Sequence, residues 1–176
     1  MSIKKIGIFV SSYKSSNTLE KVIQRIPSEI KKNAAGIFII DDASPDNSYE
    51  NALRVQKKFK LKNLTVQKNK KNLGFGGNHK VGFLYAIQQG FGVVITLHGD
   101  GQYAPEKIPE LLNSMEKNKT EIATVSRFLD NPHGVGMPRW RFFSNRFLNF
   151  LQKKILGFGL SDHNVGMRAY RVECLA

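Results

Sequence analysis

Short apolar runs alternate with amphipathic stretches along the first two thirds of the chain. The runs are rich in β-branched residues and have the length of single strands. They cover residues 6–12, 36–42, 64–69, 91–98 and 121–128. The second run, "GIFIIDD", is apolar almost throughout, which is typical of a strand that is buried on both faces.

The stretches between the runs place their apolar residues on one face of a helix. The first expected helix is capped by Ser16 or Asn17 and continues to about Ile30. Further helices are expected at 44–59, 78–89 and 104–118. Single helices between strands imply right-handed crossovers. The sequence therefore predicts a three-layer α/β/α domain with a mostly parallel central sheet, an architecture typical of nucleotide-binding proteins.

Polar residues follow several of these strands directly. "IIDD" ends the second run, "LHGD" ends the fourth and "VSR" ends the fifth. Ligands of open α/β sheets bind outside the carboxyl ends of the strands. We therefore expect these polar side chains to meet along one edge of the sheet.

The segment "LHGDGQ" carries the sharpest chemical signal. His98, Asp100 and Gln102 alternate with two glycines, so period-two geometry would send the three side chains to the same side. A carboxylate with a nearby amide oxygen can hold a divalent ion that bridges diphosphate oxygens. Imidazole would suit manganese better than magnesium. The alternative interpretation is a tight turn with a capping aspartate.

Two further motifs allow more than one interpretation. In "IIDDAS", one of Asp41 and Asp42 can accept hydrogen bonds from a nucleobase or ribose while the other orients a loop; alternatively, an aspartate caps the next helix. "NLGFGGN" carries Gly74, Gly76 and Gly77 but lacks the Lys-Ser/Thr ending of a P-loop. It predicts a close backbone approach before a helix.

The charge balance narrows the choice of partners. The chain has 27 Lys and Arg against 14 Asp and Glu, a formal charge of +13. This excess favours nucleic acid, an anionic membrane face or phosphorylated substrates. Cys174 is the only cysteine, which excludes an intrachain disulfide and indicates a reducing compartment. We expect no signal peptide, and no stretch approaches the roughly 18–20 apolar residues of a membrane span.

The alternation of apolar runs and amphipathic stretches ends at residue 131, and the composition of the chain changes from there on. Residues 139–157 are basic and aromatic on a helical period, which suits a membrane-surface helix or a lipid-phosphate site. A packed amphipathic helix with a solvated face is the alternative. Nucleic-acid binding is the weakest interpretation because no recognised module accompanies the charge. The arginines of this region are Arg127, Arg139, Arg141 and Arg146.

The last segment, "SDHNVGMRAYR", offers a carboxylate and an imidazole in a polar loop. Asp162 would be a general base if the protein transfers a group to a hydroxyl of an acceptor substrate. The alternative is an ordinary loop carboxylate. His163 is its neighbour in the sequence. We expect His79 and His133 to face solvent. Residues 166–171 look like the start of a strand or a helix with no partner after it in the chain, which suggests that a longer natural protein is cut at the C-terminus.

Taken in order, these motifs resemble family-2 glycosyltransferases, the inverting enzymes that use nucleotide sugars, and in particular their dolichyl- and polyprenyl-phosphate sugar synthases. "IFVSSYKSSNTLEKVI" is similar to the family's V-P-x-Y-N-E opening, and "IIDDAS" to V-D-D-G-S. "NLGFGGNHKVGFLYA" is similar to its N-x-G segment, and "LHGDGQYAPEKIPELL" to D-A-D-x-Q-x-P-P-E-x-I-P. "VSRF" and "SDHNVGMRAYR" are similar to G-S-R-Y and S-D-x-x-S-G-F-R-x-Y-R.

The resemblance runs from about Ile6 to Arg171 and implies a GT-A fold in one catalytic domain, residues 1–176. Residues 1–127 would form the nucleotide-sugar-binding half and residues 128–176 the acceptor side. The implied donor is a UDP- or GDP-linked sugar, the cofactor Mn²⁺ or Mg²⁺, and the acceptor a polyprenyl phosphate or a glycan. The implied place of action is the cytoplasmic face of a membrane, with contact to its surface and without nucleic acid.

The resemblance also implies roles for individual residues. The nucleotide-binding residues would be Ser11, Tyr13, Asp41, Asp42, Gly74, His98 and Gly99. The metal ligands would be Asp100, Gln102 and His98. The catalytic residues would be Asp100, Asp162 and Arg127. The phosphate-binding residues on the acceptor side would be Arg127, Arg141 and Asn145.

The chain departs from the family pattern at several positions. His98 replaces the first aspartate of D-A-D, which makes the ion site less anionic and predicts a change in metal affinity or preference. The other departures are Ser11, Lys14, Ser15, Val165 and Met167. These differences keep two alternatives open: a non-catalytic module that binds nucleotide sugars or anions, and transfer to a polysaccharide hydroxyl.

Overall fold

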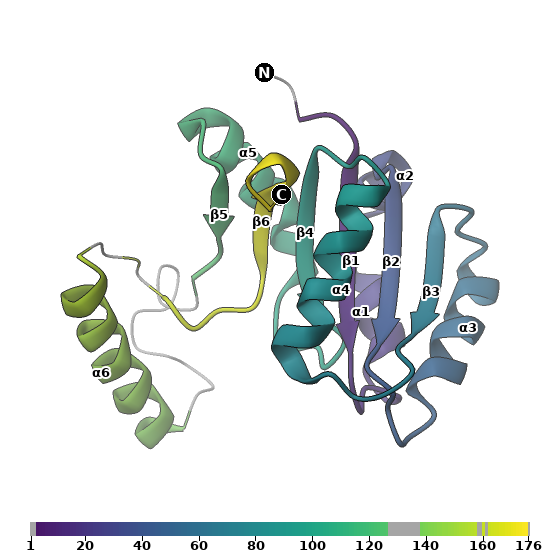
Figure 1. The fold of residues 1–176 in the computed structure, drawn as a ribbon, viewed down its shortest axis with the longest axis horizontal. Helices are drawn as coiled ribbons and strands as arrows, with labels where there is room; N and C mark the ends of the chain where they lie inside the picture. Colours follow the sequence, from purple (N-terminus) through teal and green to yellow (C-terminus); the bar gives the residue numbers. More distant parts are fainter. Residues whose placement is uncertain (1–2, 127–137, 158–159, 161, 176) are drawn as a thin grey trace.

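The computed structural model describes residues 3–126, 138–157, 160 and 162–175. Its sheet has six strands in the order β3-β2-β1-β4-β6-β5 (Figure 1). The strands are β1 (Ile6–Ser12), β2 (Gly36–Asp41), β3 (Leu64–Lys68), β4 (Val93–His98), β5 (Ile122–Thr124) and β6 (Arg168–Arg171). β3, β2, β1 and β4 are parallel neighbours, which confirms the expected mostly parallel sheet.

β6 runs against the other strands and inserts between β4 and β5. It pairs antiparallel with both, so that Ala169 lies opposite Ile95 on one side and Ala123 on the other. Residues 168–171 are thus a strand, as one of the expected alternatives had it, and both of its partners precede it in the chain. The chain leaves the parallel order after β5 and returns through the middle of the sheet.

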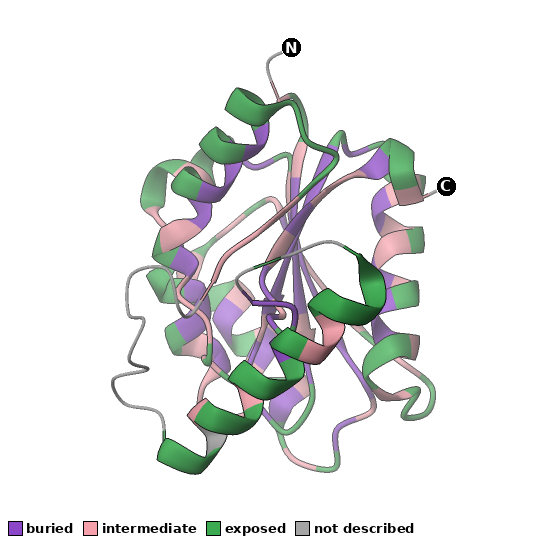
Figure 2. Ribbon diagram, turned by 90° about the vertical axis from the view of Figure 1, so that its left-hand side faces the viewer, coloured by how far each residue is buried: buried purple, intermediate pink, exposed green. Residues whose placement is uncertain are grey.

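Helices cover both faces of the sheet, which confirms the three-layer architecture. The helices are α1 (Leu19–Arg25), α2 (Ser28–Asn33), α3 (Ser48–Phe59), α4 (Gly74–Gln88), α5 (Ile108–Asn118) and α6 (Arg139–Leu156), with 3₁₀ turns η1 (Pro105–Lys107) and η2 (Val172–Leu175). α4 and η2 pack on one face, and α1, α3 and α5 pack on the other. Figure 2 shows the buried strands between these layers, and Figure 1 shows α6 standing apart from them.

An aromatic stack fills the core under α4. Phe38 lies between Phe9 and Phe91, with ring centroids 5.3 and 5.9 Å apart. Gly7 and Gly36 leave the space that the ring of Phe91 occupies, since a Cβ on either would lie 2.5 or 2.7 Å from it. The opposite face has a larger, mainly aliphatic core, which holds the parallel strands against α1, α3 and α5.

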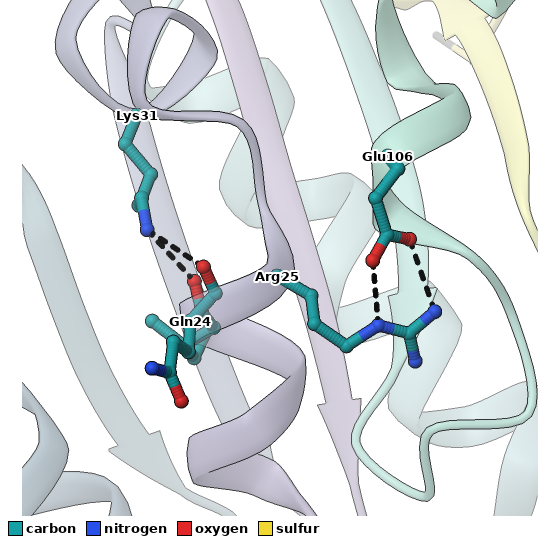
Figure 3. Close-up of polar contacts among 5 residues, drawn as sticks. Gln24, Arg25, Lys31 and Glu106 are labelled. Atoms are coloured by element: carbon teal, nitrogen blue, oxygen red, sulfur yellow. Dashed lines mark hydrogen bonds and ion pairs between the residues drawn. The ribbon is translucent and has the colours of Figure 1, made fainter.

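The first helix is shorter than its apolar pattern suggests. A continuous helix to about Ile30 is wrong because Pro27 forces the preceding residue, Ile26, into an extended conformation (ψ 128°). The chain restarts as α2 after this break. Lys31 bridges it, donating from its amino group to the carbonyl oxygens of Ile23 and Gln24 at 3.3 and 3.0 Å (Figure 3).

An exposed ion pair ties α1 to the segment that follows β4. Arg25 donates from Nε and Nη2 to the two carboxylate oxygens of Glu106, at 2.7 and 3.0 Å (Figure 3). The guanidinium lowers the pKa of Glu106 below its ordinary value. Because both side chains are largely exposed, the pair contributes about 1 kcal/mol or less.

Candidate functional site

The carboxyl ends of β1, β2 and β4 meet at one edge of the sheet, as their polar endings predicted. Ser12 lies beside Asp41 in the register of β1 and β2, and Ser11 lies beside His98 in that of β1 and β4. The third polar ending, "VSR", begins after the end of β5 at Thr124, and its arginine, Arg127, lies outside the described residues. The residues of the other two motifs, "IIDD" and "LHGD", therefore lie together at this edge.

Asp41 is fully buried and only half satisfied. Its Oδ2 accepts a hydrogen bond from the backbone N–H of Ser44 at 2.9 Å, whereas Oδ1 has no partner among the described residues. A buried polar atom without a partner costs about 1–3 kcal/mol, which a ligand with an N–H or O–H donor would recover. Tyr13 is exposed and directly follows Ser12, the partner of Asp41 in the sheet register, and Lys14 and Ala43 both have φ of 51°. Such backbone strain clusters at functional sites.

Asp42 has a different role from its neighbour. Its Oδ1 accepts hydrogen bonds from the side chain of Asn69 at 2.8 Å and from the backbone of Leu73 at 2.9 Å. The Asn69 amide also donates to Asn78, whose own amide donates to Ser11 Oγ at 2.9 Å. Asp42 therefore orients the loop that leads into α4, the second of the roles that the sequence allowed for the pair.

The glycine-rich motif lies inside α4 rather than before it. The helix begins at Gly74, four residues earlier than expected. A Cβ on Gly77 would lie 2.6 Å from Leu73 Cβ, so internal packing requires that glycine. A Cβ on Gly74 or Gly76 would meet nothing within 4 Å. At these two positions the first turn presents bare backbone, to which an anionic ligand has access.

The period-two alternation expected of "LHGDGQ" ends with the strand at His98. The next residues form a turn in which Asp100 Oδ1 accepts a hydrogen bond from the backbone N–H of Gln102 at 3.0 Å. This contact is the one that the capping alternative predicts. Asp100 and Gln102 are exposed, and Gly101 has φ of 76°. The turn thus presents the Asp100 carboxylate to solvent.

The two glycines that flank this turn in space have packing roles. A Cβ on Gly99 would lie 2.9 Å from Ser15 Oγ, at the start of α1. A Cβ on Gly166 would lie 2.5 Å from His98 Nε2. Gly166 therefore makes room for the imidazole, a constraint that the sequence did not reveal because the two residues are distant along the chain.

His98 is a largely buried, neutral imidazole. Burial lowers its pKa below the ordinary 6.5, and the nearby negative charge of Asp100 opposes that shift. Its Nε2 is buried and has no hydrogen-bond partner in the part of the chain that the structure describes. This nitrogen can therefore donate a hydrogen bond to a ligand, accept one from it, or bind a metal ion.

His98 lines a cavity of about 610 Å³ between α4, β4 and the segment before β6. Its polar and aromatic lining includes His79, Lys80, His98, Tyr103, Arg168 and Tyr170. Among the described residues that line it, two are cations and none is a carboxylate, so the cavity suits an anionic or hydroxyl-rich ligand.

His79 contradicts the expectation that it faces solvent. It is 9% exposed, its Nδ1–H donates to the carbonyl oxygen of Phe75 at 2.9 Å, and burial lowers its pKa. The signal was present in the sequence, since Phe75, His79 and Phe83 recur every four residues and therefore share one helix face. His133 lies outside the described residues.

The residues expected on the acceptor side are only partly visible. Asp162 is fully buried, and its Oδ1 accepts a hydrogen bond from the backbone of Asn164 at 3.2 Å. Asn145 lies half-buried on α6. Arg127 lies outside the described residues, and Arg141 belongs to α6 but its side chain lies outside the description. The proposed phosphate cluster stays a prediction.

The three residues that the resemblance implies as metal ligands are only partly brought together. The structure places His98 and Asp100 close enough to interact electrostatically, but Gln102 lines a second cavity of about 400 Å³ between α5 and β5. Within residues 3–126, 138–157, 160 and 162–175, no three His, Cys, Asp or Glu side chains are grouped to hold an ion. Nor does any helix of those residues have the length and apolar character to cross a membrane.

Comparison with known proteins identifies the family. The sequence profile of "Glycosyl transferase family 2" matches residues 7–176, and the chain belongs to this family. A polyprenol monophosphomannose synthase from Mycolicibacterium smegmatis is 25% identical over 96% of this chain and 62% of its own length. A UDP-N-acetylglucosamine–dolichyl-phosphate N-acetylglucosaminyltransferase from Methanococcus voltae is 24% identical over 99% of this chain and 72% of its own.

Solved structures share the fold. Glucosyl-3-phosphoglycerate synthase from Mycobacterium tuberculosis, in complex with Mn²⁺, UDP and phosphoglyceric acid, superimposes with a TM-score of 0.71 at 13% identity, over 98% of this chain and 57% of its own. A mannosyltransferase from Pyrobaculum calidifontis, in complex with GDP-mannose and Mn²⁺, gives 0.65 at 13% identity, over 97% of this chain and 45% of its own. The chain thus spans between 45% and 72% of the length of these four proteins.

Proposed function

We propose that the chain is the catalytic domain of an inverting glycosyltransferase that moves a sugar from a UDP- or GDP-linked donor to a polyprenyl phosphate. The observation that carries this proposal is the unpaired, fully buried Asp41 Oδ1 at the carboxyl edge of the sheet. The names of the lipid-phosphate relatives support the acceptor, and the nucleotides in the two structural neighbours support the donor.

The nucleoside would bind along the ends of β1 and β2. Asp41 Oδ1 would accept a hydrogen bond from a nucleobase N–H or a ribose hydroxyl, and the exposed ring of Tyr13 would contact the base. Asp42 and Ser11 would act indirectly, by holding the loop before α4 in place. The bare backbone at Gly74 would lie beside the diphosphate, while Gly99 lets α1 pack under the site.

A divalent ion fits this site when substrate phosphates supply most of its ligands. Asp100 is exposed at the edge and His98 Nε2 is unpaired, so one or both would hold the ion, and Gln102 would join them after a side-chain rotation. Mn²⁺ or Mg²⁺ would neutralise charge on the departing nucleoside diphosphate. An imidazole in place of a carboxylate favours Mn²⁺.

The burial of Asp162 favours a phosphate acceptor over a hydroxyl. A phosphate is already ionised at neutral pH and attacks the anomeric carbon without a base, whereas a hydroxyl would need one. Asp162 is the base that the motif offers, but it is fully buried in its loop. Arg127, Arg141 and Asn145 would bind the acceptor phosphate. Residues 1–127 and 128–176 would then divide donor from acceptor binding, at the cytoplasmic face of a membrane.

A donor and acceptor screen tests the proposal. Purified chain is incubated with Mn²⁺ and each common UDP- or GDP-sugar, with undecaprenyl phosphate or a glycan as acceptor, and released nucleotide and glycolipid are measured. We expect one donor to be consumed with the lipid phosphate, and Asp100→Asn to reduce turnover by roughly 10³-fold. Glu110→Gln, an exposed carboxylate on α5, is the control. Nucleotide binding without any transfer would favour the non-catalytic module instead.

A further inference from the structure

The amphipathicity of α6 is reversed relative to the domain that it contacts. The face that packs against the segment before β6 carries amides. Asn149, 8% exposed, accepts a hydrogen bond from the backbone of His163 at 3.0 Å. Gln152 and Asn164 exchange amide hydrogen bonds at 3.2 and 3.1 Å. The attachment of this helix therefore uses polar contacts at positions where a surface helix normally buries apolar residues.

Four of the five aromatic residues of α6 are exposed, and the fifth, Phe142, is half-buried. Phe143, Phe147 and Phe150 are each more than 60% exposed, as is Trp140. Spacings of three and four residues place these rings on one stripe of the helix. Figure 2 shows α6 in front of the sheet as a mostly exposed helix, and Figure 1 shows it beyond β5, toward the carboxyl edge. This stripe is apolar surface of the kind that marks an interaction site.

Positive charge surrounds the stripe. Residues 139–157 contain no Asp or Glu, while their basic residues include Arg139, Arg146, Lys153 and Lys154, all exposed. Aromatic rings flanked by cations complement an anionic lipid surface, where the rings enter the headgroup region and the cations meet the phosphates. A second copy of the chain would bring the same positive charge to the contact.

We propose that α6 docks on an anionic membrane, with the Trp140–Phe143–Phe147–Phe150 stripe in the lipid interface. The hydrogen bond between Asn149 and His163 ties α6 to the segment that lines the 610 Å³ cavity. Docking therefore brings the cavity next to the bilayer, from which a lipid acceptor would enter. Only this last step rests on the proposed function; the docking itself does not need the chemistry.

Trp140 is the only tryptophan, so tryptophan emission, excited selectively over the tyrosines, reports on this helix alone. The chain is titrated with vesicles of phosphatidylcholine, with and without phosphatidylglycerol, and binding is followed by emission shift and co-sedimentation. We expect a blue shift and co-sedimentation with the anionic vesicles. Replacing the three phenylalanines together (Phe143→Ser, Phe147→Ser, Phe150→Ser) should weaken partitioning by roughly 100-fold. Leu84→Ser, an equally exposed apolar residue on α4, should leave it unchanged.

Two double variants that remove the same charge distinguish the effect of the lysines on α6 from the effect of the net charge of the chain. Lys153→Gln with Lys154→Gln should weaken binding to anionic vesicles by about tenfold or more. Lys57→Gln with Lys62→Gln removes the same charge from an exposed surface away from α6, and should change binding by about twofold or less. Asp100→Asn should bind vesicles like the original chain, so that a failure of the chemistry is distinguished from a failure of docking.

Three results would overturn the docking proposal. The first is binding to anionic vesicles that survives the triple phenylalanine variant while circular dichroism shows that the variant is folded. The second is equal loss in both lysine pairs. The third is a dimer in sedimentation velocity without lipid that the triple variant abolishes, which would make the stripe a contact between copies of the chain.

Discussion

The carboxyl edge of the sheet and helix α6 use polar and apolar residues in opposite ways. At the edge, apolar side chains fill the core beneath and polar groups such as Asp41 and Asn78 are held inside by hydrogen bonds. On α6, amides contact the domain and four of the five aromatic side chains are exposed. The first arrangement prepares a site for a small polar ligand. The second leaves an exposed aromatic surface for the proposed contact with a lipid bilayer.

This difference also separates residues that look alike in the sequence. Asp41 and Asp42 are adjacent and both buried, yet one retains an oxygen without a protein partner and the other is committed to the loop before α4. Removing the first should affect ligand binding, whereas removing the second should affect folding. The following predictions run from the largest expected effect on stability to the smallest.

Asp42→Ala should destabilise the carboxyl edge by about 2–4 kcal/mol, because Asn69 and the backbone N–H of Leu73 lose their charged acceptor. Urea unfolding followed by circular dichroism measures the change. Glu110→Ala removes an exposed partner of Lys107 and should cost about 1 kcal/mol or less. Equal effects of the two substitutions would show that the Asp42 network does not hold the edge together.

Gly166→Ala should cost about 1–3 kcal/mol, since the added Cβ would overlap the imidazole of His98. The double variant Gly166→Ala/His98→Ala should recover much of this loss, because the smaller side chain at position 98 opens the space. A thermal-unfolding double-mutant cycle measures the coupling. Strict additivity of the two changes would mean that the contact is absent in solution.

The free energy of unfolding should fall slightly as pH drops below about 6.5 in metal-free buffer. Burial lowers the folded-state pKa of His79 and His98, so the unfolded chain binds protons first. Their stabilisation is complete above the ordinary pKa and is lost as pH falls toward the folded pKa. His79→Gln should flatten this slope in denaturant titrations between pH 7 and 5. An unchanged slope would place His79 in solvent after all.

The sequence predicted most of the sheet because its signals are local. β1, β2 and β4 are apolar runs, and the alternation with helices implied their parallel order. The position of β6 could not be predicted, since its four residues pair with strands that lie far away in the chain. Pro27 indicated the break after α1. The apolar residues on either side of it recur at helical spacing, however, and this pattern led to the prediction of a single continuous helix.

The candidate site was predicted less completely than the fold. The motifs located the carboxyl edge and the two aspartates at the end of β2, Asp41 and Asp42, because strand ends in a parallel sheet share an edge. Gly166, which faces His98, was missed because a contact between distant segments leaves no periodic trace. The turn after His98 also broke the alternation that the metal prediction assumed, since a turn rotates side chains out of the strand's period.

Calorimetric titration with UDP and GDP tests the central claim most directly. The claim is that the carboxyl edge binds a nucleoside diphosphate together with a divalent ion. We predict that one nucleotide binds in the presence of Mn²⁺, and that omission of Mn²⁺ or the Asp100→Asn substitution weakens this binding by about tenfold or more. Failure of both nucleotides to bind, or binding of equal strength without the ion and in the variant, would contradict the account.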